Sequence, residues 1–428
     1  MFLLRKINNT IGGIYVRHRI TLYNFLWRAI QILGKQGVTF VIFVLCAKYL
    51  SPYEFGIYNF VFSLIFMFAI FSDFGVSVTA SRYTAQYQIS DIKKLHVLPF
   101  NSTLIVVVLS TVVCLLVFFA RDKIKYYEYL IYCFPLLFAI PMTSLYDGIY
   151  RGLKKFKELS LINFIFGLLF IPLIYFSINK WGLKGAILAH NAYYVLLFIV
   201  VYCYSFTWKM KTKAKLDKEL IVKILKYSVL VGLSDVGLFL YTRVDVLILG
   251  HFNLVEEIGY YEIANRMYLI LILPAQLLAT VVAPKIAQIF LLKKNDLIKS
   301  NYKRDVLLLF GIGLLLAGVS YFSIGYIFAL LFDNYKSDIL LKLMTILLVL
   351  VPFRYFSTYI SIGYITPSGN VKISTVAIMF FGIVNVLLDF LLIKEFGLFG
   401  VVYATIISQI LFMLVKDLFF YFAVIRKL

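Results

Sequence analysis

The chain has 428 residues, of which 62% are hydrophobic and only 15% are charged, and its formal net charge is +21. Soluble domains are nearer half apolar and one quarter charged, and no hydrophilic stretch here exceeds about 20 residues, which excludes an enzyme with a soluble catalytic domain. Positive charge would suggest nucleic acid in a soluble protein, but in a membrane protein it is the expected Lys and Arg excess of cytoplasmic loops. We therefore expect a polytopic membrane protein without a nucleic-acid partner.

Apolar segments long enough to cross a bilayer recur along the whole chain. Helices and closed barrels alone satisfy backbone groups in lipid, and a spanning helix needs about 20 mostly apolar residues. Alternating ten-residue barrel segments are absent from the sequence. We therefore predict an all-α fold with twelve spans at 22–47, 57–80, 97–120, 128–150, 160–178, 184–206, 227–250, 258–282, 305–330, 341–364, 372–394 and 397–423.

The loops between these spans indicate the orientation of the chain. With the N-terminus placed inside, the inner segments hold about 28 Lys and Arg residues and the outer segments about nine. The positive-inside rule then predicts that both termini are cytoplasmic, which an even number of spans requires. The absence of a long soluble loop fits a multi-pass protein of a bacterial plasma (inner) membrane.

Two repeated motifs indicate an internal duplication. The motif EFGIY at 54–58 recurs as EIGYY at 257–261, an offset of 203 residues, and GLKGA at 182–186 recurs as GLFGV at 397–401, an offset of 215. Both repeats occupy equivalent places between apolar segments. Two related halves are typical of a transporter, because two similar bundles can rock about a shared site.

The most polar stretch of the chain lies between the sixth and seventh predicted spans, where the duplicated halves meet. We therefore predict an N-terminal lobe with spans one to six at 1–207, a cytoplasmic linker at 208–226, and a C-terminal lobe with spans seven to twelve at 227–428.

Catalytic and metal-binding signatures such as HExxH, GxSxG and the P-loop do not occur. We predict no catalytic residue, no metal site and no cofactor. The informative residues are ionisable ones inside spans, because a charge there costs at least a few kcal/mol and usually faces a cavity. The cations are Lys35, Arg243, Arg266, Arg354 and Lys416, and the acids are Asp73, Asp147, Asp235, Asp245, Glu262, Asp389 and Asp417.

Some of these charges have local explanations. Glu262 and Arg266 are four residues apart on one predicted helix, so they are expected to pair on one face. Lys416 lies beside Asp417 near the inner end of the last span, and we expect it to extend toward the membrane surface.

The remaining charges have no partner within their own helix. Arg243 and Asp245 are two residues apart and face different directions, while Lys35 and Arg354 have no acid one turn away. Two interpretations stay open. Lys35, Arg243, Arg266 and Arg354 converge on one cavity and bind a polyanion such as a diphosphate, or the unpaired cations form salt bridges between helices with Asp73, Asp235 or Asp389.

Coupling of transport to a proton or sodium gradient would need a membrane-embedded acid. Asp235 is the first candidate, because it lies near mid-depth of span seven with no cation one turn away. The further candidates are Asp73, Asp389 and Asp245.

Three motifs resemble those of bacterial polysaccharide transporters. AKYLSPYEFGIY at 47–58 is similar to the ARYLGPxEFGxY signature after the first helix, with Lys48 and Ser51 in place of Arg and Gly. FSDFG at 71–75 and RVDVLILG at 243–250 resemble xxDxG and RxDxxxLG of the same proteins. The order and spacing of these motifs resemble the Wzx-type lipid-linked oligosaccharide flippases of the multidrug/oligosaccharidyl-lipid/polysaccharide exporter superfamily.

The resemblance implies two six-helix lobes, related by a pseudo-two-fold axis along the membrane normal, around a central cationic cavity. It implies alternating-access transport of an undecaprenyl-diphosphate-linked oligosaccharide from the cytoplasmic to the outer leaflet, for synthesis of a surface polysaccharide such as O-antigen or capsule. The implied partners are this substrate, membrane lipids, a coupling ion, and the polysaccharide polymerase and chain-length machinery. The alternative is an ion-coupled drug/cation antiporter of the same superfamily, which would need embedded acids and fewer cavity cations.

Overall fold

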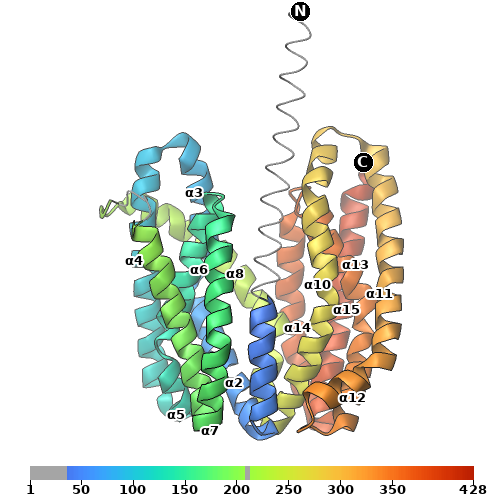
Figure 1. Ribbon diagram of the computed structural model, residues 1–428. Coiled ribbons are helices and arrows are strands. Elements are labelled where there is room, and N and C mark those ends of the chain that lie inside the picture. The colour runs from blue at the N-terminus through green and yellow to red at the C-terminus, as the bar shows by residue number, and fades with distance from the viewer. Residues whose placement is uncertain (1–35, 208–212) are drawn as a thin grey trace, which may run out of the picture.

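The computed structural model describes residues 36–207 and 213–428, and every regular element in these ranges is a helix. Figure 1 shows two helical lobes side by side, with the N-terminal half of the chain on the left and most of the C-terminal half on the right. An apolar helix at Gln36–Tyr49 precedes the N-lobe elements. These are α2 (Pro52–Asp73), α3 (Val76–Ser90), α4 (Ile92–Phe119), η1 (Arg121–Lys123), α5 (Tyr127–Leu130), η2 (Ile131–Cys133), α6 (Leu136–Gly152) and α7 (Phe156–Thr207).

The C-terminal half repeats this sequence of long and broken helices. Its elements are α8 (Lys218–Thr242), α9 (Val244–His251), α10 (Val255–Leu291), α11 (Asn295–Leu331), α12 (Ser337–Leu348), α13 (Leu350–Ile360), the π-helical η3 (Ser361–Ile365), α14 (Val371–Phe396), α15 (Leu398–Ala423) and η4 (Ile425–Lys427).

The described helices agree with the predicted spans in number. Eight are long and apolar enough to cross a membrane, and ten when each of two bent pairs is taken as one span. One of the eight, α7, holds two spans because Gly182 interrupts it with φ 54° and ψ −133°. The helix Gln36–Tyr49 is the described end of the first predicted span, so these elements account for all twelve.

The span limits are less accurate than their number. The second predicted span, 57–80, crosses a break at which Phe74 and Gly75 both have positive φ, of 39° and 79°. The seventh, 227–250, crosses a second break at Arg243 between α8 and α9. Hydropathy is continuous across both breaks, so it gave no sign of them.

The polysaccharide-transporter motif SPYE forms the start of α2. The Ser51 side chain accepts a hydrogen bond from the Glu54 backbone N–H at 3.3 Å, and the Glu54 carboxylate accepts from the Ser51 N–H at 3.0 Å. This is a capping box, and Pro52 supplies the fixed φ that suits a first helical residue. The motif therefore fixes where α2 begins, after a break from the preceding helix.

The repeat at an offset of 215 residues has one structure in both lobes. Gly397 has φ 56° and ψ −131°, almost the angles of Gly182. A Cβ on Gly185 would lie 2.6 Å from the carbonyl carbon of Ser177, and one on Gly400 would lie 2.5 Å from that of Leu392. Both members of each pair differ by 215, so the same tight helix reversal is built twice.

The repeat at an offset of 203 residues forms the contact between the lobes. A Cβ on Gly56 of α2 would overlap the backbone carbonyl of Val255, and one on Gly259 of α10 would lie 3.0 Å from Pro52 O. Pro52 and Val255 also differ by 203 residues. A contact in which residue i meets j and the copy of j meets the copy of i has two-fold symmetry. The two lobes therefore cross at a pseudo-two-fold axis.

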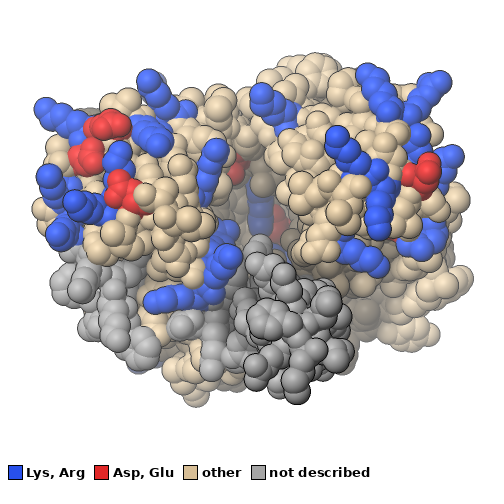
Figure 2. Space-filling model, turned by 90° about the horizontal axis from the view of Figure 1, so that it is seen from above, with Lys and Arg blue, Asp and Glu red and all other residues tan. Residues whose placement is uncertain are grey.

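The face at the top of Figure 1 is basic and hollow. Figure 2 shows this face, with Lys and Arg side chains gathered on both lobes around an opening between them. Here α3 ends, α10 is followed by α11, and the C-terminus lies.

The opposite face is held shut by contacts between the lobes. Lys125 Nζ, from the segment before α5, donates to Gly250 O at 3.0 Å, His251 O at 2.7 Å and Asn253 Oδ1 at 2.7 Å. Asn334 Nδ2 donates to Lys48 O at 2.6 Å. The hollow between the lobes is thus open at the basic face and closed at the other.

The predicted linker is partly helical. Asp217 caps α8 by accepting from Leu220 N–H at 3.0 Å, so 218–226 form the first turns of α8. This end of α8 packs on the N-lobe, with Arg82 of α3 at 4.3 Å from the centre of the Tyr227 ring. The boundary between the lobes therefore runs along α8 rather than before it.

Candidate functional site

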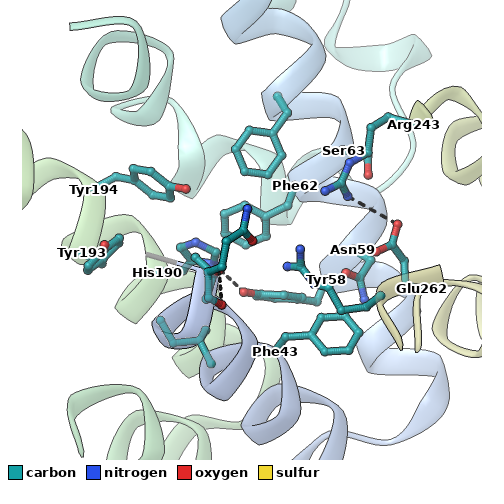
Figure 3. Close-up of a pocket in the computed structure, with 15 residues that line it drawn as sticks. Phe43, Tyr58, Asn59, Phe62, Ser63, His190, Tyr193, Tyr194, Arg243 and Glu262 are labelled. Atoms are coloured by element: carbon teal, nitrogen blue, oxygen red, sulfur yellow. Dashed lines mark hydrogen bonds and ion pairs between the residues drawn. The ribbon is translucent and has the colours of Figure 1, made fainter. Parts of the chain in front are cut away.

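A cavity of about 230 Å³ lies between the lobes where α2 passes α10. Figure 3 shows aromatic side chains on one side of it and an Arg–Glu ion pair on the other. Its walls come from the helix at 36–49, α2, α7, α10 and the break before α9. The lining residues are Gln36, Thr39, Ile42, Phe43, Tyr58, Asn59, Phe62, Ser63, Phe66, His190, Tyr193, Tyr194, Arg243, Glu262 and Arg266.

The charges of this central cavity are two arginines and one glutamate. Arg243 Nη1 lies 3.5 Å from Glu262 Oε1 (Figure 3), and the Glu262 side chain is only 5% exposed. The predicted pairing of Glu262 with Arg266 along α10 is therefore wrong. Arg243 reaches α10 because the break between α8 and α9 turns its side chain across the cavity, a long-range contact that spacing along one helix does not reveal.

Arg266 is left without an ion-pair partner among the described residues. Its Nε is buried without a hydrogen bond, and its guanidinium carbon lies 5.1 Å from the centre of the Phe43 ring. Cation–π contact compensates only part of the cost of burying the charge. The central cavity therefore carries one net positive charge, with an arginine free to bind an anion.

The N-lobe wall of the central cavity consists of stacked rings. Tyr58 OH and His190 Nδ1 share a hydrogen bond, and the His190 ring stacks on Phe62 at 4.2 Å and on Tyr194 at 5.2 Å. The sequence analysis did not select these residues.

Polar residues on α2 face the same space. A signal for them existed in Asn59 and Ser63, which lie four residues apart on one face of an otherwise apolar helix.

Arg354 lines a different cavity, of about 350 Å³, bounded by α8, α13, α14 and α15. Its Nη1 donates to Gln409 Oε1 at 2.7 Å and lies 3.5 Å from Tyr241 OH. A third space of about 370 Å³ is lined by Arg243, which also lines the central cavity, and by Asp235, which also lines the Arg354 cavity. The predicted single cavity is therefore a connected series, and Lys35 lies outside the described residues.

Lys416 points inward, so the prediction that it reaches the membrane surface is wrong. Its side chain is 2% exposed, and Nζ lies 3.2 Å from Asp417 Oδ1. Nζ also donates to Ser357 Oγ at 2.8 Å and to the Ser361 hydroxyl. Hydroxyls on α13 and η3 offer this ammonium partners inside the C-lobe, which makes extension to the surface unnecessary.

Four acids were candidates for ion coupling, and they have different environments. The Asp73 carboxylate accepts from Ser77 N–H at 3.0 Å and from Ser77 Oγ at 2.8 Å, so it caps α3 after the break at Gly75. Asp235 lines two of the cavities and has no bonding partner among residues 36–207 and 213–428. Neither acid forms the interhelical salt bridge that the sequence left open.

Asp245 and Asp389 lie together, 1% and 0% exposed, in a polar cluster of the C-lobe. Asn385 Nδ2 donates to Asp245 Oδ1 at 2.8 Å and to Asp389 Oδ2 at 3.2 Å. Thr405 Oγ1 donates to Asp245 Oδ2 at 3.1 Å, and Tyr261 OH donates to the same oxygen. Asp389 Oδ1 has no hydrogen bond in the described part of the chain.

This acid cluster has no counterpart in the N-lobe. At the offset of 215 residues, Asp389 and Asn385 correspond to Ile174 and Phe170, which are buried apolar residues. Thr405 corresponds to His190 of the stacked aromatic wall. The lobes share one backbone plan but differ in chemistry, with aromatic residues in one and carboxylates in the other.

Comparison with known proteins agrees with this architecture. A family model described as "Polysaccharide biosynthesis protein" matches residues 21–290. A multidrug resistance MATE family transporter of the MOP superfamily, solved in an inward-facing conformation, has 17% identity and a TM-score of 0.77, covering 93% of this chain and 99% of its own. The lipid II flippase MurJ, in an inward closed conformation, has 20% identity and a TM-score of 0.72, with coverage of 93% and 87%.

A eukaryotic MATE transporter, AtDTX14, has 12% identity and a TM-score of 0.64, covering 94% of this chain and 98% of its own. None of the curated proteins matches this chain. The family model spans well over half of the residues, and the motifs at 47–58 and 71–75 lie within it. The chain therefore belongs to the polysaccharide biosynthesis protein family and is a polytopic membrane transporter of the multidrug and lipid-linked flippase superfamily.

Proposed function

We propose that this protein is a flippase that moves an undecaprenyl-diphosphate-linked oligosaccharide from the cytoplasmic to the outer leaflet of a bacterial plasma membrane. The observation that carries the proposal is the net positive cavity between the lobes, where Arg243 and Arg266 face a single carboxylate, Glu262. A diphosphate brings several negative charges to this space. Guanidinium groups bind phosphate oxygens in pairs, and attraction is stronger in a space of low dielectric than in water.

Alternating access supplies the direction of transport. The basic face fits the cytoplasm by the positive-inside rule, with both termini on that side. The opening between the lobes on this face would admit the head group, while the contacts of Lys125 and Asn334 close the outer side. Rocking of the lobes about the crossing of α2 and α10 would then expose the same cavity outward.

The charge balance of the cavity predicts the effect of three substitutions on diphosphate binding. Arg266→Ala makes the cavity neutral, and we expect affinity for undecaprenyl diphosphate to fall by about 10- to 100-fold, since hydrogen bonds to charged groups contribute about 1.5–3 kcal/mol. Arg266→Lys should recover part of the loss because it keeps the charge without the planar fork. Glu262→Gln removes the competing anion and should strengthen binding. Titration of the purified protein in nanodiscs measures all three.

Lys303→Ala is the matched control, because Lys303 is an exposed cation of α11 outside the cavity. Its affinity for undecaprenyl diphosphate should equal that of the unaltered protein. Equal losses in Lys303→Ala and Arg266→Ala would mean that binding depends on overall charge, and the cavity assignment would be abandoned.

We further propose that Asp245 and Asp389, rather than Asp235, bind the coupling ion, a proton or sodium. Two buried carboxylates joined through one amide need a proton or a cation for neutrality. The unbonded Asp389 Oδ1 provides a free ligand atom. The cluster also contacts α10 through Tyr261, so its occupancy can bias the packing of the helix that crosses α2.

Asp389→Asn is therefore expected to abolish the dependence of transport on an imposed proton or sodium gradient while leaving diphosphate affinity within about twofold. Asp235→Asn, at an exposed cavity wall, should keep the gradient dependence. Proteoliposomes with a fluorescent lipid-linked substrate measure both. The reverse pattern would return Asp235 to its place as the first candidate for coupling.

The second candidate function is an ion-coupled drug/cation antiporter. The buried acid cluster and the likeness to MATE transporters favour it. It would export a cationic dye from cells and would gain nothing from Arg266, so dye efflux and its insensitivity to Arg266→Ala separate it from the flippase.

A further inference from the structure

The cavity that holds Arg354 has two walls of opposite character. Arg354 and Lys416 lie on the wall formed by α13 and α15, while Asp235 lies on α8 across the cavity. The space of about 350 Å³ is in the range of small-ligand sites. It is bounded by C-lobe helices and does not include either arginine of the central cavity.

Arg354 is the uncompensated charge of this cavity. Lys416 is neutralised by Asp417 at 3.2 Å, but the hydrogen bonds of Arg354 run to a neutral amide and a phenol. No carboxylate in the described residues lies within ion-pair distance of the Arg354 guanidinium. A guanidinium held by one amide keeps donors free for a planar, two-oxygen anion, and a carboxylate has that shape.

The remaining lining supplies hydroxyl groups. Thr358, Ser374 and Thr375 line the cavity, and their hydroxyls have no protein partner in the part of the chain that the structure describes. A hydroxyl both donates and accepts hydrogen bonds, whereas the Asp235 carboxylate accepts only. Tyr241 and Phe412, with ring centres 4.8 Å apart, complete the lining with aromatic surface. This set of partners fits a ligand that carries several hydroxyl groups as well as one anionic group.

We propose that this cavity binds a sugar residue bearing a carboxylate, such as a hexuronic acid, within the glycan of the lipid-linked substrate. A hexuronic acid has its carboxylate at one end and neighbouring hydroxyls at the other. The carboxylate binds the Arg354 fork, and the hydroxyls donate to Asp235 on the facing wall. The proposal rests on the proposed function and divides the substrate site in two: Arg243 and Arg266 bind the diphosphate, and the C-lobe cavity reads the sugar.

The connection between the two parts runs through the third space. That space is lined by Arg243 at the end near the central cavity and by Asp235 at the end near Arg354. A glycan extending from the diphosphate would pass through it into the C-lobe.

Three synthetic probes test the proposal: undecaprenyl diphosphate, and two of its disaccharide conjugates that differ only in a terminal glucose or glucuronic acid. We expect the unaltered protein to bind the glucuronic acid conjugate about tenfold more tightly than the glucose conjugate. Arg354→Gln should abolish this preference and leave the affinity for undecaprenyl diphosphate unchanged. Arg426→Gln, at an exposed cation near the C-terminus, should keep the preference.

A second variant guards against misfolding of the first. Thr375→Val changes a hydroxyl for a methyl group of similar size, and it should weaken binding of both conjugates without affecting undecaprenyl diphosphate. Equal affinity of the unaltered protein for both conjugates would overturn the proposal, as would an equal loss of all three probes in Arg354→Gln. The proposed function would survive either result, since it depends on the response of undecaprenyl diphosphate to Arg266→Ala.

Discussion

Gly56→Ala is expected to prevent the outer side of the molecule from closing and to reduce transport by more than tenfold. The added Cβ would overlap the backbone carbonyl of Val255, with the carbonyl carbon at 2.8 Å, so no flexible side chain can move away. Overpacking typically costs about 1–3 kcal/mol, and a clash with backbone lies at the upper end of that range or above it. The outward-open arrangement would separate α2 from α10 at this point and relieve the clash.

Spin labels at the exposed residues Glu128 and Asp333, at the outer ends of the two lobes, measure the closing directly. Their separation should increase in Gly56→Ala and change less in Gly259→Ala, whose Cβ would lie 3.0 Å from Pro52 O. Gly311→Ala is the matched control, because a Cβ there has no heavy atom within 4 Å. An unchanged separation in Gly56→Ala, with the protein folded, would contradict the assigned crossing.

Lys416→Met should lower stability by about 3–5 kcal/mol, the typical cost of leaving one member of a buried ion pair without its partner. The Lys416 and Asp417 side chains are 2% and 8% exposed, so water cannot replace the lost contact. Adding Asp417→Asn to Lys416→Met removes the isolated charge and should restore most of the loss, since a buried pair itself contributes little. Thermal unfolding in detergent of the two single variants and the double variant measures this coupling.

Additive effects of the two substitutions would show that the charges do not interact. In that case Lys416 would have its ammonium in water at the membrane surface, as the sequence alone predicted, and the contacts with Ser357 and Ser361 would be absent.

The fold was predictable because its main signals are local. Apolar length sets the number of spans, and the repeats at 54–58 and 182–186 identify two halves. The breaks at Gly75 and Arg243 were not predictable, because hydropathy reports the solvent around a segment and not its backbone angles. The start of α2 was present in the sequence as a capping box, although it stood inside a family motif and was not used to set the span limit.

The candidate site was predictable in composition but not in pairing. Unpaired cations indicated a cavity, and Arg243, Arg266 and Arg354 all line cavities. Their partners depend on how helices distant in sequence cross, so the Arg243–Glu262 pair could not be found from spacing. The joining of Asp245 to Asp389 through Asn385 likewise needs α9 and α14 to be adjacent.

The reciprocal contact of α2 with α10 also bears on the origin of the chain. Two separate copies of a single six-helix protein would already have met in this way, as an isologous homodimer. An even number of spans gives both copies one orientation in the bilayer, so the ancestor would not have needed to insert in two directions. Every residue of a homodimer occurs in both subunits, so the carboxylates found only in the C-lobe arose, or were lost from the N-lobe, after gene fusion. Fusion thus allowed one half to specialise in ions while the other kept its aromatic wall.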